Sequence, residues 1–257
     1  MKFFLTAIII VLTSGCVSND SKDTLAAHER AVAMMSNVDV LLVSDHTLPT
    51  HLNLSSGGAD GKERLFIDPT ISSLNSKLTE QGLNTYILNV EDMVKDGIID
   101  SKLVFDEAYS RYDDVLKAAV NADVTILAVH YDANFVPAHQ LNAKSDYIGG
   151  AHVILDERAT SEQTLALANL IINEANIISL LAQTGLRVRP GYDKKIRYQA
   201  NLTLNIAGHS RGGAALLEIG AQTQATELFG SVENTIRAID PALERLAKVL
   251  TDFRKPR

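Results

Sequence analysis

Two histidines and two glutamates occur where an α/β sheet would gather them at one edge. His46 and His130 each directly follow a β-rich apolar run. Glu63 opens a stretch with helical spacing of its apolar residues, and Glu218 lies near the end of another apolar run. Ligands of open α/β sheets bind beyond the carboxyl ends of the strands, so these four side chains are candidates for one site.

Two imidazoles and one carboxylate are the three-ligand set of a catalytic zinc ion, whose fourth position stays open. His46, Glu63 and His130 provide such a set. A metal-dependent hydrolase also needs a carboxylate that carries protons without binding the metal, and Glu218 is the candidate for this role. His51 is an alternative first ligand, but we prefer His46 because it directly follows the strand.

The elements that must position these residues follow from periodicity and from turn residues. We expect helices at 63–81, 106–121, 160–183 and 231–253. We expect strands at 38–43, 83–88, 123–129, 149–155, 202–207 and 214–219. Strands that alternate with helices predict a single α/β domain over residues 38–253, with a twisted, mostly parallel sheet covered by helices on both faces. Residues 254–257 would form a tail.

Three local signals refine these helices. Pro69 is expected in the first turn of the helix that ends at Gly82, because proline suits that position. Thr160-x-x-Gln163 forms a possible capping box for the long third helix. Pro241 is expected to break or kink the last helix.

Composition excludes several classes of protein. The chain has 257 residues, of which 46% are hydrophobic and 21% charged, which excludes a disordered chain and a polytopic membrane protein. The formal net charge is −7 and no basic stripe stands out, which argues against a nucleic-acid partner. With one cysteine, the chain cannot form an intramolecular disulfide.

The N-terminus has the pattern of a secretory signal. Met1-Lys2 is a short positive start, and the apolar run that follows is too short to span a bilayer. The run ends at Cys16, which resembles a bacterial lipoprotein signal in residues 1–15 with the cysteine as lipidation site. The absence of Asp after Cys16 resembles the outer-membrane sorting pattern, which implies a lipoprotein on the periplasmic face of that membrane. An ordinary signal peptide is the alternative. Residues 16–37 are expected to form a tether with a short helix outside the main fold.

From about Val38 to Leu250 the chain resembles the zinc-dependent N-acetylmuramoyl-L-alanine amidases. Two stretches are similar to the family's D-P-G-H-G-G and S-I-H-x-N-A motifs, and another to its P-A-x-L-x-E-x-G strand. Thr47 and Leu48 replace the glycines after the first histidine. The similar stretches are Val43–Leu48, Gly61–Arg64, Ala128–Asn134, Thr184–Arg189 and Ala214–Gly220.

This resemblance implies a Zn²⁺-dependent hydrolase of peptidoglycan that cleaves the amide bond between N-acetylmuramic acid and L-alanine. The resemblance is also compatible with an amidase-like lipoprotein that binds the cell wall but has lost catalytic activity. It does not identify a protein activator. Contact with the membrane would be through the lipid anchor. The residues that it implies are the metal ligands His46, Glu63 and His130, the catalytic Glu218, and Asn134 and Arg189 for substrate binding.

A competing motif follows the expected strand at 202–207. Gly208-His209-Ser210-Arg211-Gly212 matches the G-x-S-x-G nucleophile elbow of serine hydrolases. That fold needs its histidine after the serine, and no histidine follows His209. We therefore disfavour serine hydrolysis and expect residues 208–213 to form a loop beside the site.

Overall fold

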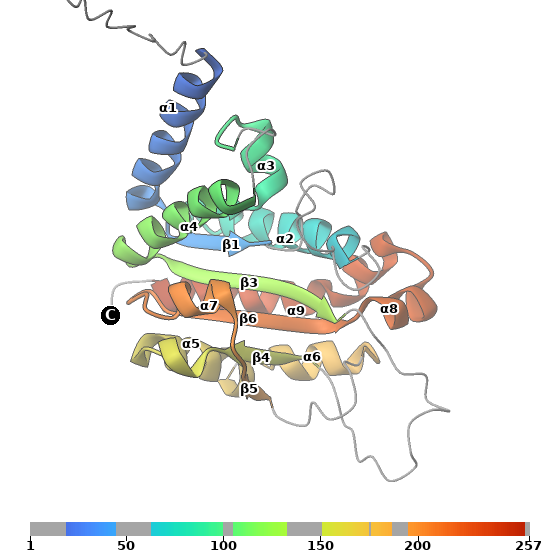
Figure 1. Cartoon of the computed structure of the whole chain (residues 1–257). Coiled ribbons are helices and arrows are strands. Elements are labelled where there is room, and N and C mark those ends of the chain that lie inside the picture. The colour runs from blue at the N-terminus through green and yellow to red at the C-terminus, as the bar shows by residue number, and fades with distance from the viewer. Residues whose placement is uncertain are drawn as a thin grey trace, which may run out of the picture.

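Six strands form one sheet between two layers of helices in the computed structural model (Figure 1). The structure describes residues 19–44, 63–99, 105–132, 151–174, 176–186 and 195–254. Within them the strands are β1 (Val40–Val43), β2 (Thr85–Leu88), β3 (Thr125–Asp132), β4 (His152–Leu155), β5 (Ile196–Tyr198) and β6 (Ala214–Ala221).

The sheet has the strand order β2-β1-β3-β6-β4-β5. β4 runs antiparallel to β6, and the other neighbouring strands are parallel. The predicted α/β domain with a mostly parallel sheet is therefore confirmed. Because β1, β2, β3 and β6 run in the same direction, their carboxyl ends meet at one edge of the sheet. The amino end of the antiparallel β4 lies at that same edge.

Helices cover both faces of this sheet, as expected. One layer holds α2 (Glu63–Glu80), α5 (Glu162–Asn169), α6 (Ile177–Gln183), α8 (Gln222–Phe229) and α9 (Val232–Arg254). The other layer holds α1 (Asn19–Met34), α3 (Val90–Lys95), α4 (Phe105–Asn121) and α7 (Leu202–Ala207). Short 3-10 turns occur at Met35–Asn37 and Glu157–Ala159.

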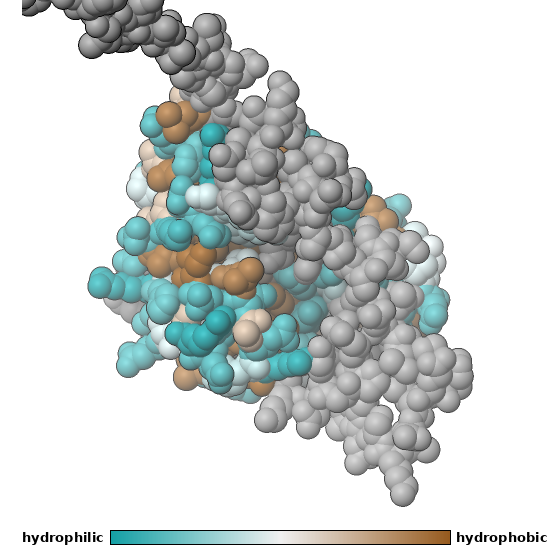
Figure 2. Space-filling model, viewed as in Figure 1, coloured by the Kyte–Doolittle hydropathy of each residue, from teal (hydrophilic) through white to brown (hydrophobic). Residues whose placement is uncertain are grey.

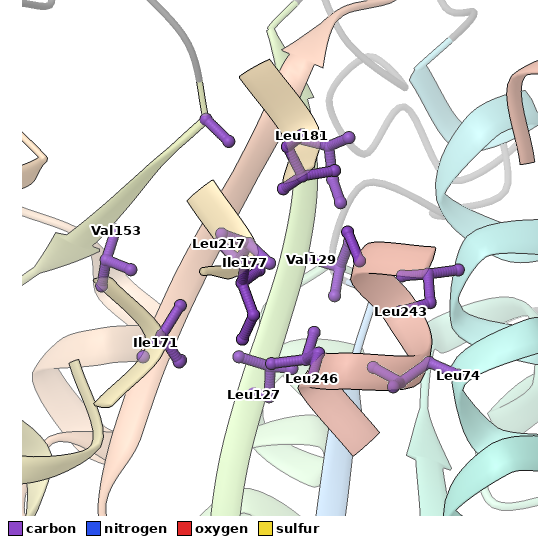
Figure 3. Close-up of a cluster of buried hydrophobic side chains, with 14 of the residues drawn as sticks. Leu74, Leu127, Val129, Val153, Ile171, Ile177, Leu181, Leu217, Leu243 and Leu246 are labelled. Carbon is purple, nitrogen blue, oxygen red and sulfur yellow. The ribbon is translucent and has the colours of Figure 1, made fainter. Parts of the chain in front are cut away.

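Alternate residues of the strands fill two separate cores. Leu127 and Val129 of β3 lie in the cluster that includes residues of α2, α5, α6 and α9, as Figure 3 shows for Leu243 and Leu246. Ile126 of β3 belongs to the opposite cluster, with α1, α4 and α7. A strand buried on both faces is apolar throughout, which explains the continuous apolar runs in the sequence.

The expected strand at 202–207 is wrong, because these residues form helix α7. The side chain of Asn201 accepts a hydrogen bond from the backbone N–H of Leu204 at 2.8 Å and so caps the helix. Leu204 and Ala207 are both buried and lie three residues apart, which is a helical spacing. An apolar run of six residues is compatible with either structure when read from the sequence alone.

The single long helix expected at 160–183 is divided into two helices, α5 and α6. α5 leads into a π-helical turn at Leu170–Glu174, and α6 starts after Asn176, which has a positive φ of 57°. The N-cap is Ser161, whose hydroxyl accepts from the N–H of Thr164 at 3.1 Å, so the predicted capping box at Thr160 is not the cap.

Pro69 and Pro241 both lie inside continuous helices. Pro69 is within α2 and not in its first turn, and Pro241 is within α9, which continues through it to Arg254. The predicted stop of α2 is confirmed, because Gly82 has a φ of +85° directly after the helix.

The second half of α1 is part of the folded domain. Ala27, Ala31 and Met35 are buried in the core with α4, so the fold begins before Val38, where the sequence placed its start. Residues 1–18, including Cys16, lie outside the described residues, as do residues 255–257. Among the described helices, none alone has the length and apolar composition to cross a membrane, although the bent pair Glu162–Asn173 and Ile177–Gln183 together does.

Hydrophilic residues dominate the described part of the surface seen in Figure 2, around a small hydrophobic patch. The large hydrophobic residues that are exposed come from elements on both layers and from the sheet edge. They are Leu25, Met34, Leu65, Leu165, Tyr198, Leu202 and Leu228.

Candidate active site

Glu63 and His130 meet at the carboxyl edge of the sheet. Glu63 is the first residue of α2, and His130 lies near the end of β3. The Nδ1 atom of His130 is 3.5 Å from Oε1 of Glu63, and the two side chains are 6% and 5% exposed. The structure thus brings together two of the predicted metal ligands, although 66 residues of chain lie between them.

The backbone of β3 holds the Glu63 carboxylate. Oε1 of Glu63 accepts a hydrogen bond from the N–H of Tyr131 at 3.0 Å. A negative charge at the first residue of a helix is also favoured by the helix dipole. A buried carboxylate needs such partners, because burial of an isolated charge is very costly.

The distance between Glu63 and His130 fits two ligands of one zinc ion. At 3.5 Å the two atoms are farther apart than in an ordinary N–H···O hydrogen bond. Zinc binds imidazole nitrogen and carboxylate oxygen at about 2.0–2.2 Å in tetrahedral geometry, which separates such ligand atoms by about 3.4 Å. The donor set is also one that zinc prefers, so the residues present fit this metal.

Glu218 lies beside His130 on the next strand. His130 of β3 and Glu218 of β6 are paired in the parallel ladder, so their side chains project from the same face of the sheet. The neighbours of Glu218 on β6 are buried, whereas Glu218 is partly exposed. This register places a carboxylate beside the predicted metal ligand His130, as a proton carrier requires.

His152 lies next to Glu218 and is not among the residues predicted from the sequence. It is paired with Glu218 across the antiparallel strands β4 and β6, and it is 1% exposed. His130, Glu218 and His152 therefore form a row across three adjacent strands. The sequence shows His152 in an apolar strand, but the antiparallel pairing that brings it to Glu218 has no sequence signal.

Ser44 is the last described residue before the predicted ligand His46. It directly follows β1 and is buried, and its hydroxyl donates to Oδ1 of Asp68 on α2 at 3.2 Å. Burial raises the pKa of Asp68, and the hydrogen bond from Ser44 opposes this shift. β1 neighbours β3 in the sheet, so the chain enters the segment with His46 at the same edge as His130.

Several predicted site residues lie outside the described residues. His46 and its alternative His51 belong to this group, as do Asn134 and Arg189. Within the described ranges no three His, Cys, Asp or Glu residues are grouped as a metal site. The structure therefore places His130 beside Glu63 and in strand register with Glu218, and the remaining assignments stay predictions.

Ser210 occupies a structural position away from this site. Its side chain is buried, and its hydroxyl donates to the carbonyl of Val124 at 2.7 Å and accepts from the N–H of Gly212 at 3.1 Å. Val124 directly precedes β3, so Ser210 lies at the edge of the sheet opposite to His130. Residues 208–213 form a loop, as expected, but this loop lies at the opposite edge of the sheet and not beside the site.

Close packing explains the glycines of this G-x-S-x-G match. A Cβ atom on Gly212 would lie 2.4 Å from the carbonyl carbon of Val124, and one on Gly208 would lie 1.7 Å from the carbonyl oxygen of Ala159. Both distances are far below van der Waals contact. The motif here is a tight turn that lets the chain pass against β3 and the Glu157–Ala159 turn, not a nucleophile elbow.

Comparisons with known proteins give structural neighbours but no sequence relatives. No protein-family model matches the sequence, and no curated protein matches it. The amidase Ami1 of Mycobacterium abscessus, an N-acetylmuramyl-L-alanine amidase, aligns with 82% of this chain and 97% of its own at 16% identity and a TM-score of 0.49. Its Mycobacterium smegmatis counterpart aligns over 84% and 99% at 14% identity and the same TM-score. The N-acetylmuramoyl-L-alanine amidase AmiC2 of Nostoc punctiforme aligns over 84% and 94% at 13% identity and a TM-score of 0.40.

Proposed function

We propose that this protein is a zinc-dependent peptidoglycan hydrolase that cleaves the amide bond between N-acetylmuramic acid and L-alanine. The observation that supports the proposal best is the buried pair Glu63 and His130, 3.5 Å apart, with Glu218 beside it in strand register. The choice of substrate rests on the motifs that resemble the amidase family.

In this proposal His46, Glu63 and His130 hold one zinc ion. A bound Zn²⁺ would polarise the amide carbonyl and would lower the pKa of a water molecule to about 7. The Tyr131 N–H keeps Oε1 of Glu63 in place for this role. The burial of both described ligands excludes bulk water from them, which strengthens electrostatic interactions at the site.

Glu218 carries the proton in the proposed reaction. Its carboxylate takes a proton from the attacking water as the new C–O bond forms at the amide carbon. It then gives that proton to the departing nitrogen as the C–N bond breaks, because an amine leaves poorly unless it is protonated. The products are the lactyl carboxylate of the sugar and a stem peptide with a free L-alanine amino group.

The test is digestion of purified sacculi with the zinc-loaded full-length chain in detergent, followed by mass analysis. We expect new L-alanine amino termini from the wild-type protein. Glu218→Gln should lower the rate by about 10²- to 10⁴-fold, because general acid–base catalysis is lost while the metal ligands remain. Its zinc content should be unchanged.

Glu233→Gln is the matched control, because Glu233 is an exposed residue of α9 and should leave the rate unchanged. Wild-type protein that stays on the sacculi without releasing L-alanine amino termini would instead support an inactive wall-binding protein. Thr47 and Leu48, in place of the family's glycines, are the observation that favours this second candidate. Undiminished turnover by Glu218→Gln would remove Glu218 from the proposed mechanism.

A further inference from the structure

Tyr131 contacts three successive turns of α2. Its backbone N–H donates to Glu63, its ring packs against Phe66 with centroids 5.3 Å apart, and its hydroxyl lies 2.9 Å from Oγ1 of Thr70. Glu63, Phe66 and Thr70 are spaced by three and four residues and therefore share one face of the helix. One residue of β3 thus contacts the face of α2 that begins with the proposed metal ligand.

The available hydroxyl protons decide which residue donates in the contact between Tyr131 and Thr70. Thr70 Oγ1 also lies 2.7 Å from the carbonyl oxygen of Phe66, to which it donates its one proton. Tyr131 must therefore donate its own hydroxyl proton to Thr70. Tyr131 and Thr70 are 1% and 0% exposed, so no solvent competes for this hydrogen bond.

The first turns of α2 need such support because of Pro69. Proline has no N–H, so the carbonyl of Leu65 lacks its usual helical donor within the first two turns. The first N–H groups of a helix also have no intrahelical acceptor. The start of α2, where Glu63 lies, is therefore held by fewer helical hydrogen bonds than its later turns. The contacts with Tyr131 add support to this part of the helix.

We infer that Tyr131 is a positioning residue that fixes the start of α2 on β3 and thereby holds the Glu63 carboxylate beside His130. This inference rests on the proposed zinc site, to which it adds the residue that orders one of the ligands before the metal binds. Residues that orient metal ligands contribute strongly to affinity, and their loss commonly weakens metal binding 10- to 100-fold.

The test measures the zinc dissociation constant of the full-length chain by competition with a chromogenic chelator. Tyr131→Phe keeps the ring and the backbone N–H and removes the hydrogen bond to Thr70. We expect its dissociation constant to rise about tenfold. Tyr112→Phe is the matched control, because Tyr112 is a buried tyrosine of α4 in the opposite layer. It should leave zinc affinity unchanged.

A double-mutant cycle with Thr70→Val separates positioning from general stability. Thr70→Val alone should weaken zinc binding about as much as Tyr131→Phe, and the double variant should weaken it no further, because both changes remove the same hydrogen bond. Additive losses in the double variant would overturn the inference, as would a Tyr131→Phe protein with wild-type zinc affinity. Wild-type protein that binds no zinc would overturn both the inference and the proposed function.

Discussion

Ser210 and Glu218 lie close in the sequence, yet the structure places them at opposite edges of the sheet. β6 runs between them, with Ser210 before its start and Glu218 near its end. Burial and hydrogen bonds then distinguish their roles. Ser210 donates to a backbone carbonyl in the interior, whereas Glu218 is partly exposed beside His130. The strongest motif match in the sequence is therefore structural, and the proposed hydrolytic site lies at the other edge.

Ser210→Ala should lower stability without affecting hydrolysis. The change removes one buried hydrogen bond to Val124 and one from Gly212, with an expected cost of about 1–3 kcal/mol in the free energy of unfolding. Urea denaturation measures this cost, and the sacculus digest should be unchanged. A fluorophosphonate probe should not label Ser210 in the wild-type protein. Labelling at Ser210, or loss of hydrolysis in Ser210→Ala, would contradict this interpretation.

The residues of the site could be predicted in part. The sequence predicts that Glu63, His130 and Glu218 lie at one edge of the sheet, because strand ends and helix starts of an α/β fold meet there, and the structure places them at that edge. His152 and Tyr131 were missed for a physical reason: their roles depend on strand pairing and on side-chain contacts between distant segments. Such contacts leave no periodic pattern in the sequence.

The helices and strands could also be predicted only in part. Long periodic segments such as α2, α4 and α9 were predicted almost to the residue, because a long apolar stripe is unambiguous. The short run at 202–207 was assigned to a strand, although Asn201 and Leu204 carry a helix-cap signal. β5 was missed because three residues at a sheet edge are too few to show alternation.

Asp156 connects the Glu157–Ala159 turn to the start of helix α7, and its ionisation makes the stability of the fold depend on pH. Its carboxylate accepts from the N–H and guanidinium of Arg158 and from the N–H of Asn201, the cap residue of α7. The hydrogen bond from the Arg158 side chain, more than any other contact, lowers the pKa of Asp156 well below its usual range. The stabilisation is therefore complete above the unfolded-state pKa of about 3.9 and is lost as the pH falls below it.

Asp156→Asn should lower the free energy of unfolding by about 2 kcal/mol at pH 7, because the amide forms weaker hydrogen bonds than the carboxylate. Its stability should then fall less steeply than that of the wild type below pH 4. Urea denaturation at pH 7 and at pH 3.5 measures both effects. Asp240→Asn, an exposed partner of Lys77, is the control and should cost less than about 1 kcal/mol. Equal losses in the two variants would contradict the role of Asp156.

At the scale of the whole molecule, α1 joins the predicted anchor to the domain. Its second half is packed in the core through Ala27 and Ala31, so the part that can act as a spacer is short. The helical residues 19–26 span about 12 Å at 1.5 Å per residue. If Cys16 is lipidated as we propose, the domain is held close to the membrane surface on its periplasmic side. The enzyme would then act on the nearest layer of the wall.

Cys16→Ser should move the protein from the membrane fraction to the soluble fraction, because firm anchoring requires the acyl chains. Metabolic labelling with a radioactive fatty acid should mark the wild type and not the variant. The folded domain should keep its melting temperature, since Cys16 precedes Ala27, the first buried residue among those that the structure describes. Wild-type protein without fatty-acid label would show that the N-terminal segment is an ordinary signal peptide.

The zinc content of the purified protein shows whether Glu63 and His130 belong to one metal site. Atomic-emission analysis should find about one zinc per chain in the wild type, as for a single three-ligand site. His130→Ala should lose most of this zinc, whereas Glu218→Gln should retain it. Full zinc occupancy in folded His130→Ala, or a wild-type protein that takes up no zinc, would contradict the account.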